Sequence, residues 1–268
     1  MQPMLNIALR AARKAGEIIA RASEQTERLK IETKGTNDFV TDIDRAAERE
    51  IVYHIRKAYP DHAILGEESG QSDNPDSDYQ WVIDPLDGTT NFIRGIPHYA
   101  VSIACLYKGV IEHAVVLDPI RREEFTASRG RGAQLNGRRI RVSQMTSMEG
   151  ALLGTGIPYK NRNDELMPEF MGSLAAVASQ TAGIRRAGAA ALDLAYVAAG
   201  RLDGFWEVSL NRWDIAAGIL LIKEAGGLVS DFQGGNKHFE TGNIVAANPK
   251  VLKPLLQTLK PHLGKVGQ

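Results

Sequence analysis

The order of predicted strands and helices changes in the middle of the chain, and this change restricts the fold most. Two runs rich in Val, Ile and Ala, joined by Lys108-Gly109, predict an antiparallel hairpin over residues 99–117 that continues as a meander. Beyond about residue 145, short apolar runs alternate with helical segments instead. We therefore expect an α+β half over residues 1–145 and an α/β half over residues 146–268, which together form one compact unit.

Composition and charge exclude several classes of protein. The 268 residues are 43% apolar and 24% charged, as in globular proteins, and 32 basic residues balance 32 acidic ones. A net charge of zero provides no overall attraction to nucleic acid or membrane. The single cysteine, Cys105, excludes a disulfide scaffold and is expected to pack in an apolar strand. Residues 1–20 predict an amphipathic helix rather than a signal peptide, so we expect a cytoplasmic protein without a membrane partner.

The acidic residues are concentrated in one stretch of the chain. Residues 61–90 contain eight carboxylates and no lysine or arginine. The carboxylates of the loop 73–78 are expected to be solvated, because this loop contains Pro and Ser. Asp84 instead follows the apolar run 81–83, where a buried carboxylate without a partner is unfavourable and where sheets often bind ligands. A cation is therefore expected beside Asp84.

The turn after this strand combines candidate metal ligands with a candidate anion site. Its proline can turn Asp84 and Asp87 toward one point together with the carbonyl of Leu86, an all-oxygen set that suits Mg²⁺. Gly88 allows a ligand to approach the backbone, and Thr89 begins a predicted short helix whose free N–H groups can hold a phosphate. Such a turn taken alone is often only a surface turn, but the buried strand before it favours a site.

Two further carboxylates can join this set from elsewhere in the chain. Glu67 follows a short predicted strand, and its alternative role is that of a loop carboxylate. Asp214 begins a predicted helix, where its alternative role is an N-cap. With Asp84 and Asp87 they provide four carboxylates from three segments, which is enough to bind two bridged Mg²⁺ ions.

Three motifs occur here in an order known from one enzyme family. They are Glu67-Glu68-Ser69, the nine residues from Asp84 to Phe92, and Trp213-Asp214. In these motifs, and over nearly its whole length, the sequence resembles the inositol monophosphatases, in particular their bacterial SuhB branch. The resemblance implies a layered αβαβα sugar-phosphatase fold. It also implies lithium-sensitive, Mg²⁺-dependent hydrolysis of inositol 1-phosphate and similar polyol phosphates by metal-activated water.

The resemblance further implies how the metal ions are held. Glu67, Asp84 and the carbonyl of Leu86 would hold the first Mg²⁺. Asp84, Asp87 and Asp214 would hold the second, and a third, weaker ion would lie near Glu67.

Catalytic and substrate-binding roles are implied in the same way. Glu67 and Thr89, with Asp44 behind Thr89, would orient the attacking water. The residues implied in binding the phosphate or the polyol are Leu86, Asp87, Gly88, Thr89, Arg185, Gly188, Ala189, Ala190, Glu207 and Asp214. The stretch 156–163 differs from the animal enzymes, so substrate stringency is left open. His98, close to the second motif, is expected to be structural.

Other roles compete with this one. The SuhB branch is associated with Nus-type antitermination of ribosomal RNA transcription through NusA and RNA polymerase, and Arg185 and Arg186 could contribute to such a scaffold surface. A homodimer is also implied, and the Ala-rich helix 189–199 would permit close packing between two copies. Seven arginines between residues 121 and 141 favour a solvated meander and leave an RNA contact open as the alternative. Fructose-1,6-bisphosphatase and bisphosphate nucleotidase remain alternatives, although Glu207 favours a polyol.

Overall fold

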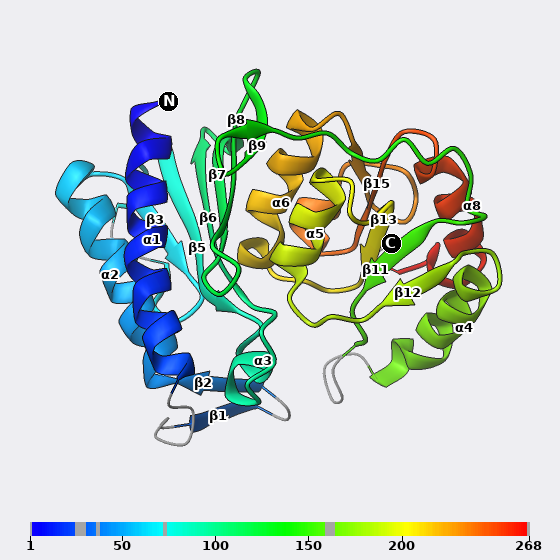
Figure 1. The fold of residues 1–268 in the computed structure, drawn as a ribbon, viewed down its shortest axis with the longest axis horizontal. Helices are drawn as coiled ribbons and strands as arrows, with labels where there is room; N and C mark the ends of the chain where they lie inside the picture. Colours follow the sequence, from blue (N-terminus) through cyan, green and yellow to red (C-terminus); the bar gives the residue numbers. More distant parts are fainter. Residues whose placement is uncertain (1, 25–30, 36–37, 72–73, 159–163, 267–268) are drawn as a thin grey trace.

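The protein forms five alternating layers of helices and strands, which are seen edge-on in Figure 1. The structure is a computed structural model that describes residues 2–24, 31–35, 38–71, 74–158 and 164–266. Two helices cover the outer face of the first sheet, two lie between the sheets, and two cover the outer face of the second sheet. These pairs are α1 (Pro3–Ser23) with α2 (Asp42–Ala58), α5 (Ala190–Ala198) with α6 (Arg212–Glu224), and α4 (Met167–Ala178) with α8 (Leu252–Leu263). The expected αβαβα layering is therefore confirmed.

The first sheet has eight strands in the order β10-β9-β8-β7-β6-β5-β3-β4. Its strands are β3 (Ala63–Gly66), β4 (Gly70–Gln71), β5 (Tyr79–Asp87), β6 (Ala100–Tyr107), β7 (Val110–Asp118), β8 (Glu123–Ser128), β9 (Gly132–Leu135) and β10 (Arg138–Arg139). The predicted hairpin is confirmed as β6 and β7, with positive φ angles of 49° at Lys108 and 78° at Gly109. The turn expected directly after the apolar run 81–83 does not begin at Asp84, because β5 continues and pairs with β6 again at Asp87 after an irregularity.

The second sheet has five strands in the order β12-β11-β13-β15-β14. Its strands are β11 (Leu152–Thr155), β12 (Gly183–Arg185), β13 (Gly204–Glu207), β14 (Leu228–Ser230) and β15 (Ile244–Ala247). Strand β11 pairs in parallel with β12 and β13, but β15 pairs antiparallel with β13 and β14, so this sheet is mixed. The remaining elements are a hairpin of β1 (Ile31–Gly35) and β2 (Asp38–Thr41), the short helices α3 (Thr89–Ile93) and α7 (His238–Thr241), and the 3₁₀ turn η2 (Asp164–Leu166).

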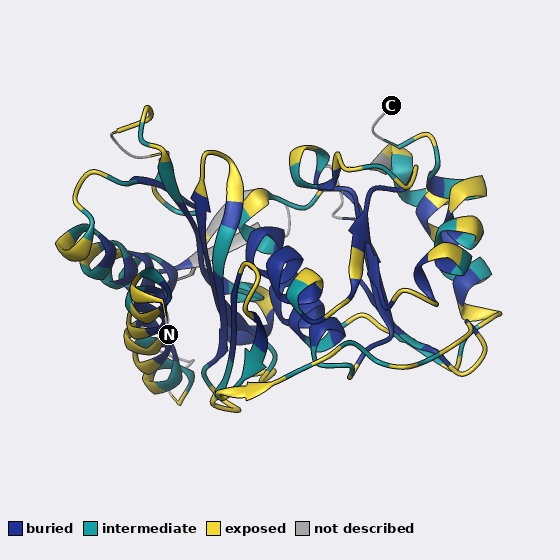
Figure 2. Ribbon diagram, turned by 90° about the horizontal axis from the view of Figure 1, so that it is seen from above, coloured by how far each residue is buried: buried dark blue, intermediate teal, exposed yellow. Residues whose placement is uncertain are grey.

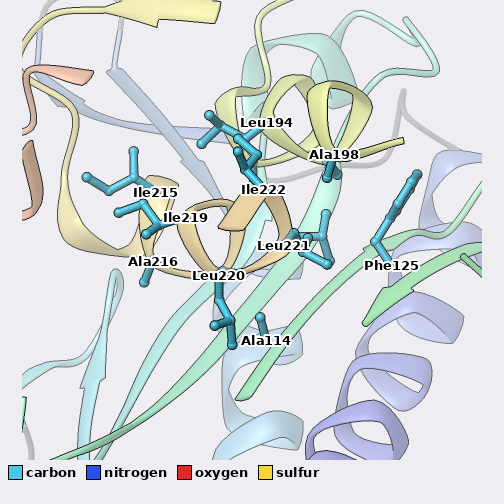
Figure 3. Packing of buried hydrophobic residues seen from close by; sticks show 14 of the residues in the cluster. Ala114, Phe125, Leu194, Ala198, Ile215, Ala216, Ile219, Leu220, Leu221 and Ile222 are labelled. Atoms are coloured by element: carbon cyan, nitrogen blue, oxygen red, sulfur yellow. The ribbon is translucent and has the colours of Figure 1, made fainter. Parts of the chain in front are cut away.

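Helices α5 and α6 are buried on almost all sides, because they fill the space between the two sheets (Figure 2). Leu194 and Leu221 from these helices share one apolar cluster with Ala114 and Phe125 of the first sheet (Figure 3). Gly218 in α6 allows α5 to approach, since a Cβ there would lie 2.5 Å from Cβ of Leu194. The Ala-rich helix therefore packs inside the protomer, and the idea that it mediates contact between two copies is wrong.

Helix α1 has one buried face and one exposed face, as its sequence predicts. Leu5, Leu9 and Ile19 pack against the first sheet and α2. None of the helices in the described part of the chain is long and apolar enough to span a membrane. Cys105 is buried in β6, and burial raises the pKa of its thiol to about 12, so its expected role in packing is confirmed.

Candidate active site

The hydroxyl of Thr89, the first residue of α3, connects helix α2 to the end of β5. It lies 2.9 Å from Oδ1 of Asp44 and 3.0 Å from the carbonyl oxygen of Leu86. The other carboxylate oxygen of Asp44 accepts a hydrogen bond from the Thr41 N–H at 2.9 Å, which closes the capping box of α2. Burial raises the pKa of Asp44, and the hydrogen bonds from Thr41 and Thr89 partly oppose this. Because the hydroxyl has one proton, its lone pairs can accept a bond from a third group.

Asp84 is 1% exposed and lies among other carboxylates. Its Oδ1 accepts a hydrogen bond from the Leu86 N–H at 2.9 Å. Burial, followed by the charges of Glu67, Asp87 and Asp214, raises the pKa of Asp84 well above its usual range. The structure thus brings the four predicted carboxylates within electrostatic reach of one another.

Asp87 links the first sheet to the start of α5. Its Oδ2 accepts a hydrogen bond from the Ala191 N–H at 2.7 Å. Burial raises the pKa of Asp87 well above its usual range. The hydrogen bond from Ala191 lowers this pKa, whereas the charges of Asp193 and Glu207 raise it further. The two halves of the chain therefore meet at this carboxylate.

Asp214 lies at the third position of α6, and the N-cap is Asn211. The N–H of Asn211 donates to Oδ2 of Asp214 at 2.7 Å in a capping box. The alternative role of Asp214 as the N-cap itself is therefore wrong. Its carboxylate still acts electrostatically on Asp84 and Glu207.

Glu207 lies at the end of β13, with its carboxylate against Gly156. A Cβ at Gly156 would overlap this carboxylate, so a larger residue there would displace the side chain of Glu207. Burial, followed by the charges of Asp193 and Asp214, raises the pKa of Glu207 to about 8. Residues 159–163 of the stretch that differs from the animal enzymes lie outside the described part of the chain.

The backbone around Gly88 is closely packed against the loop before α5. Gly88 has a φ of 92°, a conformation that favours glycine. A Cβ at this position would lie 3.0 Å from the carbonyl oxygen of His98, 3.1 Å from Cβ of Ala189 and 3.2 Å from the carbonyl oxygen of Gly188. Asn91 joins the same segments, since its amide donates at 2.8 Å to the carbonyls of His98 and Ala187. The predicted phosphate loop and the predicted polyol segment, which ends in Ala190, are therefore adjacent.

The two neighbouring arginines, Arg185 and Arg186, have different neighbours. Arg185 is exposed and donates to the carbonyl of its neighbour Ile184 at 3.2 Å. Arg186, which the sequence did not single out for this site, lies beside Gly188, and its charge lowers the pKa values of Asp193 and Glu207. Basic charge reaches the candidate site through Arg186.

Sequence reasoning also missed two buried carboxylates. Glu48 of α2 accepts hydrogen bonds from the backbone of the turn that carries Glu67. Asp193 of α5 is 2% exposed, and its Oδ1 lies 3.3 Å from Nε2 of His98. The spacing of Asp44 and Glu48 by four residues on one helix face was the available signal for Glu48. The side chain of His98 packs between elements, which fits the structural role expected for it.

The donor chemistry of the site suits a hard divalent cation. In the described residues, no three Asp, Glu, His or Cys side chains surround one point closely enough to hold a metal ion by themselves. The set predicted for the first ion also includes the carbonyl of Leu86, whereas Asp84, Asp87 and Asp214, predicted for the second ion, would have to close around it. Every donor in both sets is an oxygen. A bound cation would offset the burial and the repulsion from neighbouring carboxylates that raise the pKa values of Asp84 and Asp87. These residues therefore fit Mg²⁺ in composition and charge.

An αβαβα fold with an acidic all-oxygen site between its halves defines the class of sugar phosphatases that the sequence motifs indicate. The model of the inositol monophosphatase family matches residues 1–263, and the chain belongs to this family. It is 62% identical over 265 residues to the Nus factor SuhB of Pseudomonas aeruginosa, with 98% of each chain covered.

Solved structures agree with this assignment. The crystal structure of the extragenic suppressor protein suhB from Bartonella henselae has a TM-score of 0.93 and 43% identity, with 100% of both chains covered. The inositol monophosphatase from Anabaena has a TM-score of 0.87 and 37% identity, and the match covers 97% of this chain and 96% of that one.

Proposed function

We propose that the protein is a Mg²⁺-dependent phosphomonoesterase that hydrolyses inositol 1-phosphate and similar polyol phosphates. The observation that carries this proposal is the convergence of Glu67, Asp84, Asp87 and Asp214: burial, followed by the charges of the other three, raises the pKa of Asp84. Glu67, Asp84 and the Leu86 carbonyl would hold one ion, and Asp84, Asp87 and Asp214 a second, with a third near Glu67. When bound, the ions would neutralise phosphate charge, activate water and stabilise the leaving alkoxide.

The protein's own groups would position the reactants. With its proton donated to Asp44, the Thr89 hydroxyl can accept a hydrogen bond from a water and orient it together with Glu67. The N–H groups of Gly88 and Thr89 would hold phosphate oxygens. Glu207 would accept hydrogen bonds from polyol hydroxyls beside the 188–190 backbone.

One stack of aromatic rings, of the kind on which a nucleotide base could pack, lies away from the candidate site. Tyr59, His62, Tyr79 and Tyr107 form a ring stack with centroid separations of 4.6–4.7 Å. This stack lies at the start of β5, whereas Asp84 and the turn with the candidate ligands lie toward its end. It therefore offers no platform for a base at the candidate site.

Phosphate release from three substrates tests the proposal. Inositol 1-phosphate, fructose 1,6-bisphosphate and adenosine 3′,5′-bisphosphate are compared with and without Mg²⁺, and with Li⁺ added. We expect release that requires Mg²⁺, is inhibited by Li⁺ and is fastest from inositol 1-phosphate. Negligible turnover of all three would contradict the proposal.

Mg²⁺ is expected to raise the melting temperature more at about pH 8.5 than at about pH 6. The folded-state pKa values of Asp84 and Asp87 are raised, and that of Glu207 is about 8, so the folded protein without metal holds extra protons at low pH. The stability due to these protons is present at low pH and is lost as the pH rises through the folded-state values. Mg²⁺ competes with these protons for the carboxylates, so the stabilisation that Mg²⁺ provides increases with pH. Calorimetric melting curves measure this, and an equal gain at both pH values would contradict it.

We also propose a second role, as a scaffold in transcription antitermination with NusA or RNA polymerase as a partner. It is favoured by the name of the relative from Pseudomonas aeruginosa, a Nus factor. Arg185 and Arg186 are exposed at the end of the edge strand β12, where a partner could reach them. Reversing both charges should reduce recovery of NusA or polymerase in a pull-down, and unchanged recovery would argue against this surface.

Direct RNA binding and dimerisation have different support. Phe125, the aromatic residue within the arginine-rich stretch 121–141, is fully buried, so it cannot stack on a base. Arg121 and Arg129 in the same stretch form ion pairs with Asp118 and Glu112.

A homodimer remains a proposal from the family resemblance, testable by measuring the mass in solution.

A further inference from the structure

Helix α2 carries two buried carboxylates one turn apart, and each contacts a different loop of the candidate site. Asp44 contacts Thr89 in the turn after β5. Glu48 lies four residues later on the same face of the helix and is 3% exposed. It contacts the turn after β3, which carries Glu67.

Glu48 holds the backbone of this turn directly. Its Oε2 accepts a hydrogen bond from the Glu68 N–H at 2.9 Å, and its Oε1 accepts one from the Ser69 N–H at 2.8 Å. The N–H of Glu67 donates to the carbonyl of Ile83 in β5 at 3.1 Å. Three consecutive N–H groups of the turn are therefore held, the first by the sheet and the next two by Glu48.

The space for this carboxylate is provided by the residue before the turn. A Cβ at Gly66 would lie 2.5 Å from Oε2 of Glu48, so a larger residue would displace the carboxylate. Each oxygen of Glu48 faces one backbone donor, so the two hydrogen bonds fix both the position and the orientation of the carboxyl group against the turn. The arrangement therefore strongly restricts the conformation of the turn.

We propose that Glu48 is a positioning residue that sets the place of the Glu67 carboxylate for Mg²⁺ binding without touching the ion or the substrate. Because Asp44 and Glu48 project from one rigid helix, α2 holds the Glu67 turn and the Thr89 turn at a constant separation. This inference rests on the proposed function and adds the residue that organises one of its metal ligands.

The variant Glu48→Gln tests this role. The amide has a similar shape but only one acceptor oxygen, and its NH₂ group would face one of the two backbone N–H donors. We expect the Mg²⁺ concentration for half-saturation to rise about 10- to 100-fold, as for other lost outer-shell partners of metal ligands. Calorimetric titration with Mg²⁺ and phosphate release should show the same shift. At saturating Mg²⁺, kcat should return to nearly the wild-type value.

Glu50→Gln is the matched control, because Glu50 lies on the same helix but is partly exposed and pairs with His54 at 3.1 Å. It should leave Mg²⁺ binding unchanged. An unchanged half-saturation in folded Glu48→Gln would overturn the proposal, and so would a lower melting temperature with unaltered Mg²⁺ affinity. Glu48→Asp, which withdraws the carboxylate by one methylene, provides the same comparison if the Gln variant does not fold. A wild-type protein that binds no Mg²⁺ in calorimetry would instead refute the proposed function.

Discussion

Replacing Asp87 by Asn should abolish phosphate release and leave the fold intact. Asn has the same shape, and its carbonyl oxygen can still accept the hydrogen bond that Ala191 donates to Asp87 at 2.7 Å. The change removes a negative charge from the candidate ligand set. Removing a group that only hydrogen-bonds to a metal ligand typically lowers metal affinity or activity by about 10- to 100-fold. Because Asp87 is itself a candidate ligand, we expect kcat to fall by at least about 100-fold.

The same variant should behave unusually in a stability measurement. Because burial and neighbouring carboxylates raise the pKa of Asp87, its neutral replacement relieves repulsion in the protein without metal. Its melting temperature without Mg²⁺ should therefore equal or exceed that of the wild type at about pH 8. Asp76→Asn changes an exposed carboxylate of the same acidic stretch and should alter neither property. Wild-type release by Asp87→Asn would refute the assignment of this residue.

The second large effect is expected from Gly218→Val in α6. A Cβ at Gly218 would lie 2.5 Å from Cβ and 2.6 Å from Cδ1 of Leu194, in the middle layer of the fold. The position of a Cβ atom is fixed by the backbone, so rotating a side chain cannot relieve this overlap. Helix α5 would therefore have to move away from α6. Overpacking of this kind should lower the free energy of unfolding by about 3 kcal/mol and the melting temperature by about 6–12 °C.

Gly183→Val is the corresponding control for this prediction. A Cβ at Gly183, in the edge strand β12, would meet Arg185 at 3.4 Å and Leu152 at 3.8 Å, which are ordinary contacts. Calorimetric melting of both variants compares them directly. Equal melting temperatures for Gly218→Val and the wild type would show that α5 and α6 can separate without loss of packing.

Much of the candidate site was predictable because it consists of local motifs. The buried strand before Asp84 and the turn around Gly88 are encoded in consecutive residues, and so are the short helix after Gly88 and the hairpin at Lys108-Gly109. The acidic excess of residues 61–90 also indicated a need for a cation before any geometry was known. Propensity and turn chemistry act over a few residues, so such features can be read from sequence.

The remaining features depend on which surfaces pack together. The Ala-rich sequence of α5 suits contact with another copy or burial inside one protomer, and only the second sheet shows that it is buried. Glu48 and Arg186 look like ordinary helix and strand charges until the turn of Glu67 and the carboxylate of Glu207 lie beside them. The capping role of Asn211 was hidden in the same way, because Asp214 three residues later has an equally suitable side chain.

The late position of α6 in the chain has a consequence for biosynthesis. The first sheet is complete at Arg139, but α6, which covers its inner face, ends at Glu224, about 85 residues later. At about 5–20 residues per second, a ribosome needs about 4–17 s to make this stretch. Until α5 is made, the apolar inner face, including Ala114 and Phe125, has no covering helix; α5 then covers part of it, and α6 covers the rest. The nascent protein is therefore most prone to aggregation in this interval, and a translational pause within it should lower the yield of folded protein.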